Sequence, residues 1–262
     1  MLGLVQFANI GGQYRGAFSQ SFMSSIPESI SAEETRIREA YARRRSGNLY
    51  SRFNRAYLFM VQEREQGFLR LLSRFRVVPL ENTRVLEIGC GNADLLRDFI
   101  KWGARPENLV GIELIAERVA EAIQLCPTDV KIQKGNAADL QMSDQSFDVV
   151  LQSTVFTSVL DSNTKQRMAS EMLRVVKQNG LILWYDYHMN NPKNPDVRGV
   201  KMREIKRLFP DCDIRLQRIT LAPPIARRLA PYSWLLCYFL SRIPWLCSHY
   251  IGVIRKKPFL RH

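Results

Sequence analysis

The alternation of apolar segments after Pro79 constrains the fold of this chain more than any other feature. Runs typical of β-strands alternate with runs in which apolar residues recur every three or four positions, as they do along a helix. The strand-type runs cover residues 83–89, 108–114, 129–135, 147–153 and 181–187, and the helical runs cover 93–103, 116–126 and 164–180. Strands joined through helices run parallel in a sheet that is covered on both faces. The pattern therefore predicts an α/β fold with a doubly wound sheet.

The two ends of the chain depart from this alternation. Residues 213–221 and 249–256 have the pattern of two further strands, and an apolar helical insertion lies between them near 223–247. No strand is expected before Pro79. Residues 1–30 are predicted to form a mobile arm, because Gly, Ser, Gln and Phe recur there without a period.

Two helices are expected between the arm and Pro79. The first begins at Ser31, where Ser31 and Glu34 have the spacing of a capping box, and the second covers residues 54–75. Tyr50 and the Arg43–Arg45 cluster lie between them. We therefore divide the chain into an N-terminal arm and helical lid, 1–78, and a second domain, 79–262.

The chain is strongly basic, with a formal net charge of +13 and an isoelectric point near 9.8. Residues 193–262 carry 15 Lys or Arg against 4 Asp or Glu. Such a balance favours an anionic partner, which is nucleic acid, a phospholipid surface or a phosphorylated substrate, and it does not choose among them. The five cysteines form no CxxC pair, so neither a disulfide framework nor a zinc site is expected, and a reducing cytoplasm fits.

A glycine-rich turn follows the first strand of the alternating region. The run Glu87-Ile-Gly89-Cys90-Gly91 lets a ligand approach the backbone and meet the N-terminus of the next helix. Asp94 stands where a dinucleotide fingerprint, GxGxxG, would need glycine. Glu113 ends the second strand, 22 residues after Gly91, where its carboxylate can accept the ribose hydroxyls of an adenosine.

Polar residues also follow the third strand. Asn136 and Asp139 lie there, where an amide or carboxylate can take the adenine amino group. Together with SFDVV at 146–150, these residues resemble the class I S-adenosylmethionine-dependent methyltransferases over about residues 80–190. The chain departs from that pattern twice. Ala93 replaces the third glycine, which requires that this position need no positive φ, and Asn136 stands where many relatives have Asp.

The resemblance implies a Rossmann-like doubly wound sheet of seven strands, mostly parallel with an antiparallel last strand. It implies S-adenosyl-L-methionine as the cofactor. The residues expected to bind the cofactor are Glu87, Gly89, Cys90, Gly91, Glu113, Leu114, Asn136, Ala137, Asp139 and Gln152. Further blocks, among them residues 184–200, resemble a bacterial group of methyltransferase type 11-like enzymes of polysaccharide or other secondary biosynthesis, whose acceptors are poorly defined.

The strand that ends in WYDYH carries the candidate catalytic residues. It points to the carboxyl edge of the sheet, where open α/β folds bind ligands. His188 and Asp186 are candidate bases, and Tyr185 is a third candidate. A histidine just past a strand is more often a hydrogen-bonding loop residue, and Asp186 can equally brace the loop that follows. Asp148, at the start of the fourth strand, is expected to be structural.

The sequence leaves the acceptor open. A hydroxyl of a sugar or other small biosynthetic intermediate leads, and a lipid-like or quinone acceptor at the membrane surface is the alternative. Residues 151–156, LQSTVF, lack the Asn/Asp-Pro-Pro-aromatic clamp suited to amines of bases, so nucleic acid is not expected, and no acidic cluster suggests a metal. Outside this class, Asp94 opposes an NAD-dependent oxidoreductase, while a cofactor-binding pseudoenzyme subunit stays open.

The expected location of the protein in the cell depends on its most apolar segment, residues 231–240. This segment is too short to span a bilayer, and the N-terminus does not have the pattern of a signal peptide, so a cytoplasmic protein is expected. Apolar residues occur on nearly all sides of the segment, which favours a helix buried in its own domain. The alternative is an amphipathic cover over an acceptor pocket or on an anionic membrane. The oligomeric state is open.

Overall fold

The structure is a computed structural model, and it describes residues 28–43 and 48–257. One seven-stranded sheet forms its centre, in the order β3-β2-β1-β4-β5-β7-β6. In chain order the strands are β1 Val85–Ile88, β2 Leu109–Glu113, β3 Lys131–Lys134, β4 Phe147–Ser153, β5 Val176–Tyr187, β6 Cys212–Leu221 and β7 Cys247–Lys256. In this order, all neighbouring strands from β3 through β5 pair in parallel, whereas β7 runs antiparallel to both β5 and β6. The predicted seven-stranded, doubly wound sheet is confirmed.

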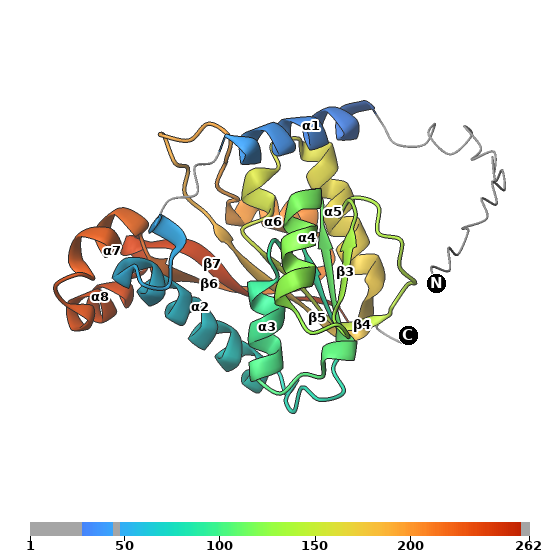
Figure 1. Cartoon of the computed structure of the whole chain (residues 1–262), viewed down its shortest axis with the longest axis horizontal. Helices are drawn as coiled ribbons and strands as arrows, with labels where there is room; N and C mark the ends of the chain where they lie inside the picture. The colour runs from blue at the N-terminus through green and yellow to red at the C-terminus, as the bar shows by residue number, and fades with distance from the viewer. Residues whose placement is uncertain (1–27, 44–47, 258–262) are drawn as a thin grey trace, which may run out of the picture.

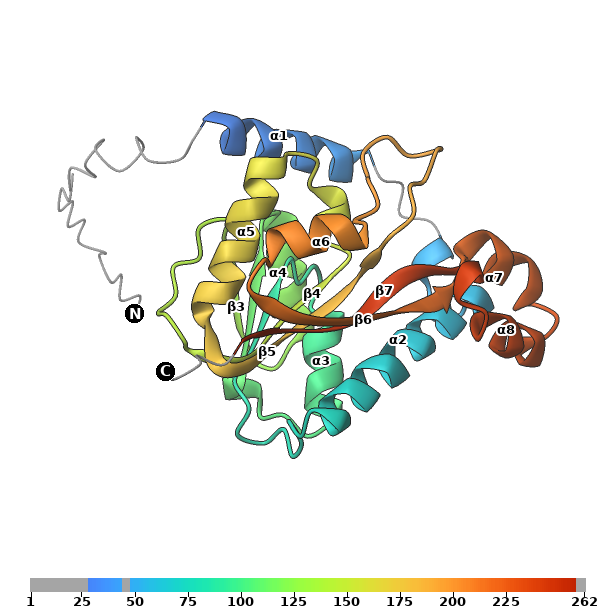
Figure 2. The same cartoon turned by 180° about the vertical axis from the view of Figure 1, so that it is seen from behind.

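Helices cover both faces of the sheet (Figures 1 and 2). The described α-helices are α1 Glu28–Ala42, α2 Arg55–Arg74, α3 Asp94–Lys101, α4 Ala116–Leu125, α5 Ser162–Val175, α6 Met202–Leu208, α7 Pro223–Leu229 and α8 Trp234–Ser241. Short 3₁₀ turns η2 Asn48–Tyr50, η3 Pro106–Asn108, η4 Phe156–Ser158 and η5 Pro244–Leu246 connect some of them. From β1 the chain first adds β2 and β3 on one side and then β4 and β5 on the other, so the strand order reverses at β1. The carboxyl ends of β1 and β4 meet at this switch point, where such sheets bind ligands.

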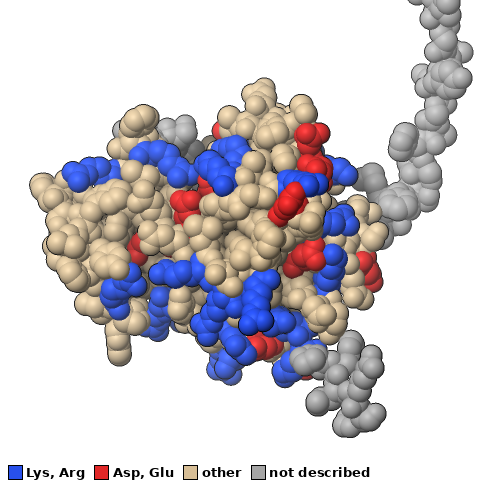
Figure 3. Space-filling view, turned by 90° about the horizontal axis from the view of Figure 1, so that it is seen from below, with Lys and Arg blue, Asp and Glu red and all other residues tan. Residues whose placement is uncertain are grey.

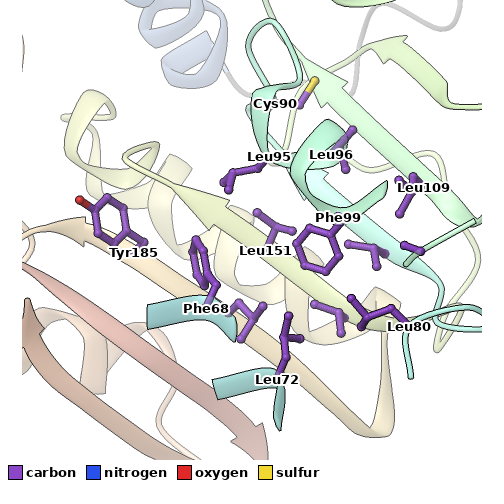
Figure 4. Packing of buried hydrophobic residues seen from close by; sticks show 14 of the residues in the cluster. Phe68, Leu72, Leu80, Cys90, Leu95, Leu96, Phe99, Leu109, Leu151 and Tyr185 are labelled. Carbon is purple, nitrogen blue, oxygen red and sulfur yellow. The ribbon is translucent and has the colours of Figure 1, made fainter. Parts of the chain in front are cut away.

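Successive residues of each strand enter two different cores, because side chains alternate across a sheet. Val149 and Leu151 of β4 pack with α2, α3 and α4, while Val150 packs with α5 and α6. In the first core, Phe68 of α2 is fully buried and its ring lies 6.1 Å from the ring of Tyr185 on β5 (Figure 4). The helix α2 is therefore part of the main core rather than a detached appendage.

The N-terminal helices were only partly predicted. The second helix is confirmed as α2, and Asn54 caps it by accepting hydrogen bonds from the amides of Ala56 and Tyr57 at 3.1 and 3.2 Å. The capping box is wrong, because α1 begins at Glu28 and Ser31 lies inside it. Most of the predicted mobile arm, and part of the Arg43–Arg45 cluster, lie outside the described residues.

The helix α1 lies across the end of α5, at the top of the molecule in Figure 1, and contacts the turn that follows β4. Arg36 donates to the carbonyl oxygen of Ser158 at 2.5 Å, and the same guanidinium pairs with Glu33 at 2.8 Å. Glu33 in turn accepts the amide of Leu160 at 2.5 Å. Burial raises the pKa of Glu33, but the bonds from Arg36 and Leu160 prevail and leave it lowered, so the charged pair is stable at neutral pH. Both residues hold α1 against the turn after β4.

The helix predicted over 164–180 ends earlier than expected. The structure ends α5 at Val175, and β5 begins at Val176 by pairing with Phe147. Gly180, which was expected to close the helix, lies within β5 beside a register shift of β4, where a Cβ would stand 2.8 Å from the carbonyl oxygen of Asp148. Close approach of two strands, and not a helix end, explains this glycine.

The connection between β6 and β7 carries the predicted apolar insertion. It folds as α7, α8 and η5, which lie beside the N-terminal end of α2 in both views (Figures 1 and 2). A small core joins them to α2, with Ala56 and Phe59 on one side and Ala226 and Cys237 on the other. Of α8 itself only Cys237 is buried, while Trp234 and Leu240 pack against the small core, so the helix is buried in its own domain on one side only. Over residues 28–43 and 48–257, no helix has both the length and the apolar character needed to cross a membrane.

Candidate active site

The turn after β1 is built for close approach of a ligand. Gly89 and Gly91 both adopt positive φ, at 61° and 60°, which L-residues with side chains rarely do. A Cβ on Gly89 would stand 2.6 Å from Val155 Cγ2, and a Cβ on Gly91 would collide with the guanidinium of Arg118. The turn then leads directly into the N-terminus of α3. The positive φ thus favours glycine at both positions, and the lack of space beside Val155 also favours it at Gly89.

Ala93 is the residue at which the sequence expectation is wrong. It adopts φ 60°, the left-handed conformation, although the replacement of glycine was expected to be tolerated only without a positive φ. The conformation costs roughly 1–2 kcal/mol for a residue with a Cβ. Its methyl group is fully buried with Leu95 and Leu96 in the first core, which offsets part of that cost. Packing beneath the turn therefore holds it in shape.

Glu113 joins the end of β2 to this turn. One carboxylate oxygen accepts the amide of Gly91 at 2.8 Å, and the other accepts the amide of Ile115 at 3.0 Å. The guanidinium of Arg118 lies 3.8 Å from the same carboxylate and over the ring of Tyr41 on α1. Each carboxylate oxygen has a second lone pair, so Glu113 retains the capacity to accept hydroxyls of a ligand.

Two buried polar groups beside the turn have no partner among the described residues. They are the Oε2 atom of Glu87 at β1 and the Nε2 atom of Gln152 at the end of β4. Burial raises the pKa of Glu87 well above its ordinary value, and only Arg64 among its main charged neighbours opposes that shift. An unpartnered polar atom is costly to bury, so each of these two atoms marks a place where a polar group of a ligand can bind.

The residues after β3 are arranged differently from the expectation. Asn136 donates to the carboxylate of Glu34 on α1 at 2.6 Å and accepts the amide of Ala138 at 2.8 Å. Asp139 is exposed, whereas Asn136 and Ala137 are half-buried. The structure thus brings Asn136 and α1 together at the carboxyl edge and leaves the carboxylate of Asp139 facing solvent.

Two further expected residues contribute backbone more than side chain. Cys90 is buried, burial raises the pKa of its thiol strongly, and its sulfur would stand 2.8 Å from a Cβ on Gly111. Its amide donates to the carbonyl of Ile112 at 3.0 Å. Leu114 is half-buried beside Glu113. Both residues therefore shape the turn.

The three predicted catalytic residues of β5 do not converge. Asp186 is buried and accepts hydrogen bonds from the hydroxyl and the amide of Thr157 and from the amide of Tyr187. Burial raises its pKa to about 6, against the opposing effect of these bonds. Tyr185 lies on the other face of the sheet in the first core.

His188 lies at the end of β5, beyond both. Its Nε2 atom is 2.9 Å from the carbonyl oxygen of Cys247, and its ring packs on Tyr250 at 4.6 Å between centroids. Burial lowers its pKa. These contacts agree with the alternative of a histidine that hydrogen-bonds locally.

An aromatic cluster on the α2 side of the sheet was missed from the sequence. His249 of β7 is 3% exposed, and its ring stacks on Tyr185 at 4.5 Å and lies 3.7 Å from Tyr187 between centroids. Burial lowers its pKa well below 6.5, so its imidazole is neutral. His249 looked like an ordinary strand residue in HYIGVIRK, and only its pairing opposite Tyr187 reveals it.

Arg64 of α2 connects this cluster to the glycine turn. Its guanidinium lies 5.9 Å from the ring centroid of Tyr185 and donates to Ser153 Oγ at 3.3 Å, while its Nε atom is buried without a partner. Burial raises the pKa of Glu87, of Tyr185 and of Tyr57, and the positive charge of Arg64 opposes that rise in all three. The sequence placed Arg64 in a helix but gave no signal that the helix faces the site.

Asp148, which the sequence predicted to be structural, makes contacts that join strands. Asp148 accepts the amide of Arg84 at 2.9 Å and pairs with Lys177 at 2.7 Å, at the amino end of β4. These bonds fasten β1 to β5 far from the glycine turn.

Comparisons with known proteins place methyltransferases among the proteins that this chain resembles. A family described as "Methyltransferase domain" matches residues 85–180. Over 114 residues, 42% of this chain, the sequence is 33% identical to the 2-methyl-6-phytyl-1,4-hydroquinone methyltransferase of Synechocystis sp.. Over 111 residues, 40% of this chain, it is 31% identical to the ubiquinone biosynthesis O-methyltransferase of Azorhizobium caulinodans. The matched segments span 34% and 40% of those relatives' own lengths.

Among solved structures, a SAM-dependent methyltransferase of Thermotoga maritima, described as a possible histamine N-methyltransferase, superposes with a TM-score of 0.56 at 18% identity. It covers 84% of this chain and 100% of that one, which shows a shared fold. The fold is that of the class I S-adenosylmethionine-dependent methyltransferases. Residues 85–180 carry the match to the methyltransferase domain, and S-adenosyl-L-methionine is the cofactor of the class.

The buried carboxyl of Asp186 should make stability depend on pH. Its folded pKa of about 6 exceeds the ordinary 3.8, so its contribution is fully present below about pH 4 and is lost as pH rises through 6. We expect Asp186→Asn to gain up to roughly 3 kcal/mol relative to the native protein between those limits. Urea unfolding across the pH range measures the difference.

Asp161→Asn provides a control of opposite sign. Hydrogen bonds from Thr164 lower the pKa of Asp161 at the N-cap of α5, so its contribution is present above the ordinary pKa and disappears in acid. A native protein and an Asp186→Asn variant with parallel pH profiles would contradict the assignment.

Proposed function

We propose that this protein transfers a methyl group from S-adenosyl-L-methionine to a hydroxyl of a small, aromatic and lipid-like acceptor. The observation that carries the proposal is the arrangement of Glu87, Gly91 and Glu113 at the carboxyl edge of β1 and β2. This arrangement brings together the open turn at Gly91, the carboxylate of Glu113 that accepts its amide, and the buried carboxyl of Glu87, one oxygen of which has no partner.

The donor side follows from the chemistry of these groups. Glu113 would hold the ribose hydroxyls, and the unpaired oxygen of Glu87 would meet the ammonium group of the methionine part. Gln152 would supply its unpaired amide donor at the same edge. When bound, the cofactor supplies a sulfonium-bound methyl group that passes to the acceptor oxygen as the carbon–sulfur bond breaks. The protein must then align the acceptor and take its proton.

The residues proposed to meet the acceptor favour a lipid-like or quinone acceptor over a sugar. Tyr185, Tyr187 and His249 form a set of packed rings beside Arg64, and a flat aromatic acceptor can stack on such rings. Two relatives bear names of hydroquinone and ubiquinone-pathway methyltransferases. Both considerations support a phenolic acceptor.

The state of His249 supports the same choice. A buried imidazole whose pKa lies well below 6.5 is neutral and can accept a proton, but it is a weak base. A phenol, with an ordinary pKa of about 10, gives up its proton far more readily than a sugar hydroxyl. We therefore assign His249 as the group that receives the acceptor proton, in preference to Asp186, His188 and Tyr185.

The lid function predicted for residues 1–78 is proposed here for α1. Glu34 and Tyr41 of α1 reach Asn136 and Arg118 at the places that flank Glu113. Glu33 and Arg36 fasten the same helix to the turn after β4. We infer that α1 covers the bound adenosine, and that release of the cofactor requires α1 to detach.

Cofactor binding is the first test of the proposed function. Calorimetry should show binding of S-adenosylhomocysteine, and Glu113→Ala should weaken it by about 1–3 kcal/mol through the loss of charged hydrogen bonds. Glu117→Ala, which removes an exposed carboxylate from the first turn of α4, should leave the affinity unchanged. Binding of NAD in place of the homocysteine compound would refute the assignment of the cofactor.

Limited proteolysis tests the cover formed by α1. Trypsin cleavage at Arg36, Arg38 and Arg43 should slow when S-adenosylhomocysteine is bound, whereas cleavage at the exposed Arg227 and Arg228 of α7 should not change. Asn136→Ala should remove part of the protection, because it breaks the bond to Glu34. Equal cleavage of α1 with and without the ligand would show that this helix does not cover the site.

The acceptor class is tested with a radiolabelled methyl donor. A hydroquinone that carries an isoprenoid tail should be methylated, and a nucleotide sugar should not. His249→Gln should lower kcat by about 10²–10⁴-fold, while the affinity for S-adenosylhomocysteine stays unchanged. Label in the sugar and none in the hydroquinone would overturn the acceptor, and full activity of the His249 variant would overturn the base.

A further inference from the structure

The insertion between β6 and β7 exposes large apolar side chains on one surface. Tyr232 is 87% exposed, Leu235 66%, Phe239 60% and Trp245 83%. We call the α8 surface the set of exposed apolar residues of this insertion: Tyr232, Leu235, Leu236, Tyr238, Phe239, Ile243 and Trp245. A large exposed apolar surface of this kind typically marks a site where a membrane or another protein binds.

The α8 surface is held rigidly from behind. The opposite side of α8 packs through Trp234, Cys237 and Leu240 against α2 and α7. The ring of Trp234 meets that of Phe59 edge-on at 5.8 Å, and Arg55 donates to the carbonyl oxygen of Pro231 at 2.6 Å. The exposed side chains therefore cannot turn inward without the loss of this core.

Positive charge surrounds the α8 surface. No Asp or Glu occurs from Ile214 to the C-terminus, a stretch with 9 Lys or Arg. Arg227 and Arg228 are exposed on α7, and Arg242 lies 4.3 Å from the ring centroid of Tyr238. Figure 3 shows Lys and Arg gathered over much of the face of the molecule seen from below.

A groove of about 420 Å³ between α2, β6 and α8 adjoins this surface. Four arginines line it, Arg70, Arg74, Arg218 and Arg242. Its one carboxylate, Glu63, already accepts the amide of Leu221 at 3.0 Å. The groove thus offers guanidinium groups for phosphate beside an apolar edge.

We propose that the α8 surface docks on a bilayer that contains anionic phospholipid. Apolar and aromatic side chains enter the interface between headgroups and acyl chains, and the flanking arginines meet the phosphates. A second copy of the chain is a poorer occupant. A twofold contact through this surface would bring the arginines of both copies together with no carboxylate of the insertion between them.

Docking in this way would place the aromatic cluster near the bilayer. The insertion packs on α2, the helix whose Arg64 lies over the ring of Tyr185, so it adjoins the side of the site where the acceptor is proposed to bind. The docking itself does not rest on the proposed transferase activity, because it needs neither cofactor nor acceptor.

Vesicle flotation of the full chain tests the proposal, without cofactor or acceptor. The protein should float with vesicles of phosphatidylcholine and phosphatidylglycerol, and much less with phosphatidylcholine alone. The binding should weaken as salt is added. The double variant Phe239→Ser, Trp245→Ser should lower binding at least about tenfold. Ile123→Ser, which replaces a comparably exposed apolar residue of α4, should bind as the native protein does.

A charge series separates the arginines from the apolar residues. Arg227→Gln with Arg228→Gln should lower binding to anionic vesicles roughly tenfold or more. Lys131→Gln with Lys134→Gln, an equal loss of charge on β3, should change it little. Unfolding curves of all variants confirm that each is folded.

Three results would overturn the proposal. They are an absence of flotation with anionic vesicles, flotation that the Phe239 and Trp245 variant retains in full, and self-association in light scattering that this variant abolishes while no vesicle is bound. Retained S-adenosylhomocysteine binding in the same samples would show that the transferase assignment stands apart from that outcome.

Discussion

The hydrogen bond from the Gly91 amide to Glu113 is the interaction on which the site depends. It joins the turn after β1 to the end of β2, and those two places are 22 residues apart in the chain. The turn presents the Gly91 amide as the donor of this bond in a backbone conformation in which Gly89, Gly91 and Ala93 all adopt positive φ. The buried methyl of Ala93 and the packing of α3 beneath it maintain that conformation. The open edge that receives a ligand is thus a product of the core below it.

The parallel half of the fold could be predicted because each of its elements carries its own local signal. Strands such as 147–153 and the helix 55–74 are apolar at their proper periods, and their ends were placed to within a few residues. The errors arose where pairing between distant segments overrides local pattern. Val176 continues a helical period in sequence, but Phe147 draws it into β5. Ser31 and Glu34 match a capping box, but Glu34 bonds to Asn136, 102 residues away.

The same distinction applies to the site. The glycines, Glu87 and Glu113 lie in one loop and one strand end, so their order along the chain reveals them. Arg64 and His249 come from α2 and β7, which meet only when the sheet is complete. No spacing announces such residues, because the contact that gives each its role is made across the fold. His188, next to a motif that drew attention, hydrogen-bonds a neighbouring carbonyl instead.

The position of β7 between β5 and β6 separates the two halves of the chain in a further way. The glycine turn, Glu87, Glu113 and Gln152 lie on strands β1 to β4 and the turn after β1, within the residues 85–180 that match the family. His249 and the α8 surface belong to an antiparallel hairpin that follows, and its connection can lengthen or change without a shift in any parallel strand. A chain built in this order can keep one donor while it exchanges the molecule that receives the methyl group. Relatives that match only the parallel half therefore indicate the methyl donor more surely than the acceptor.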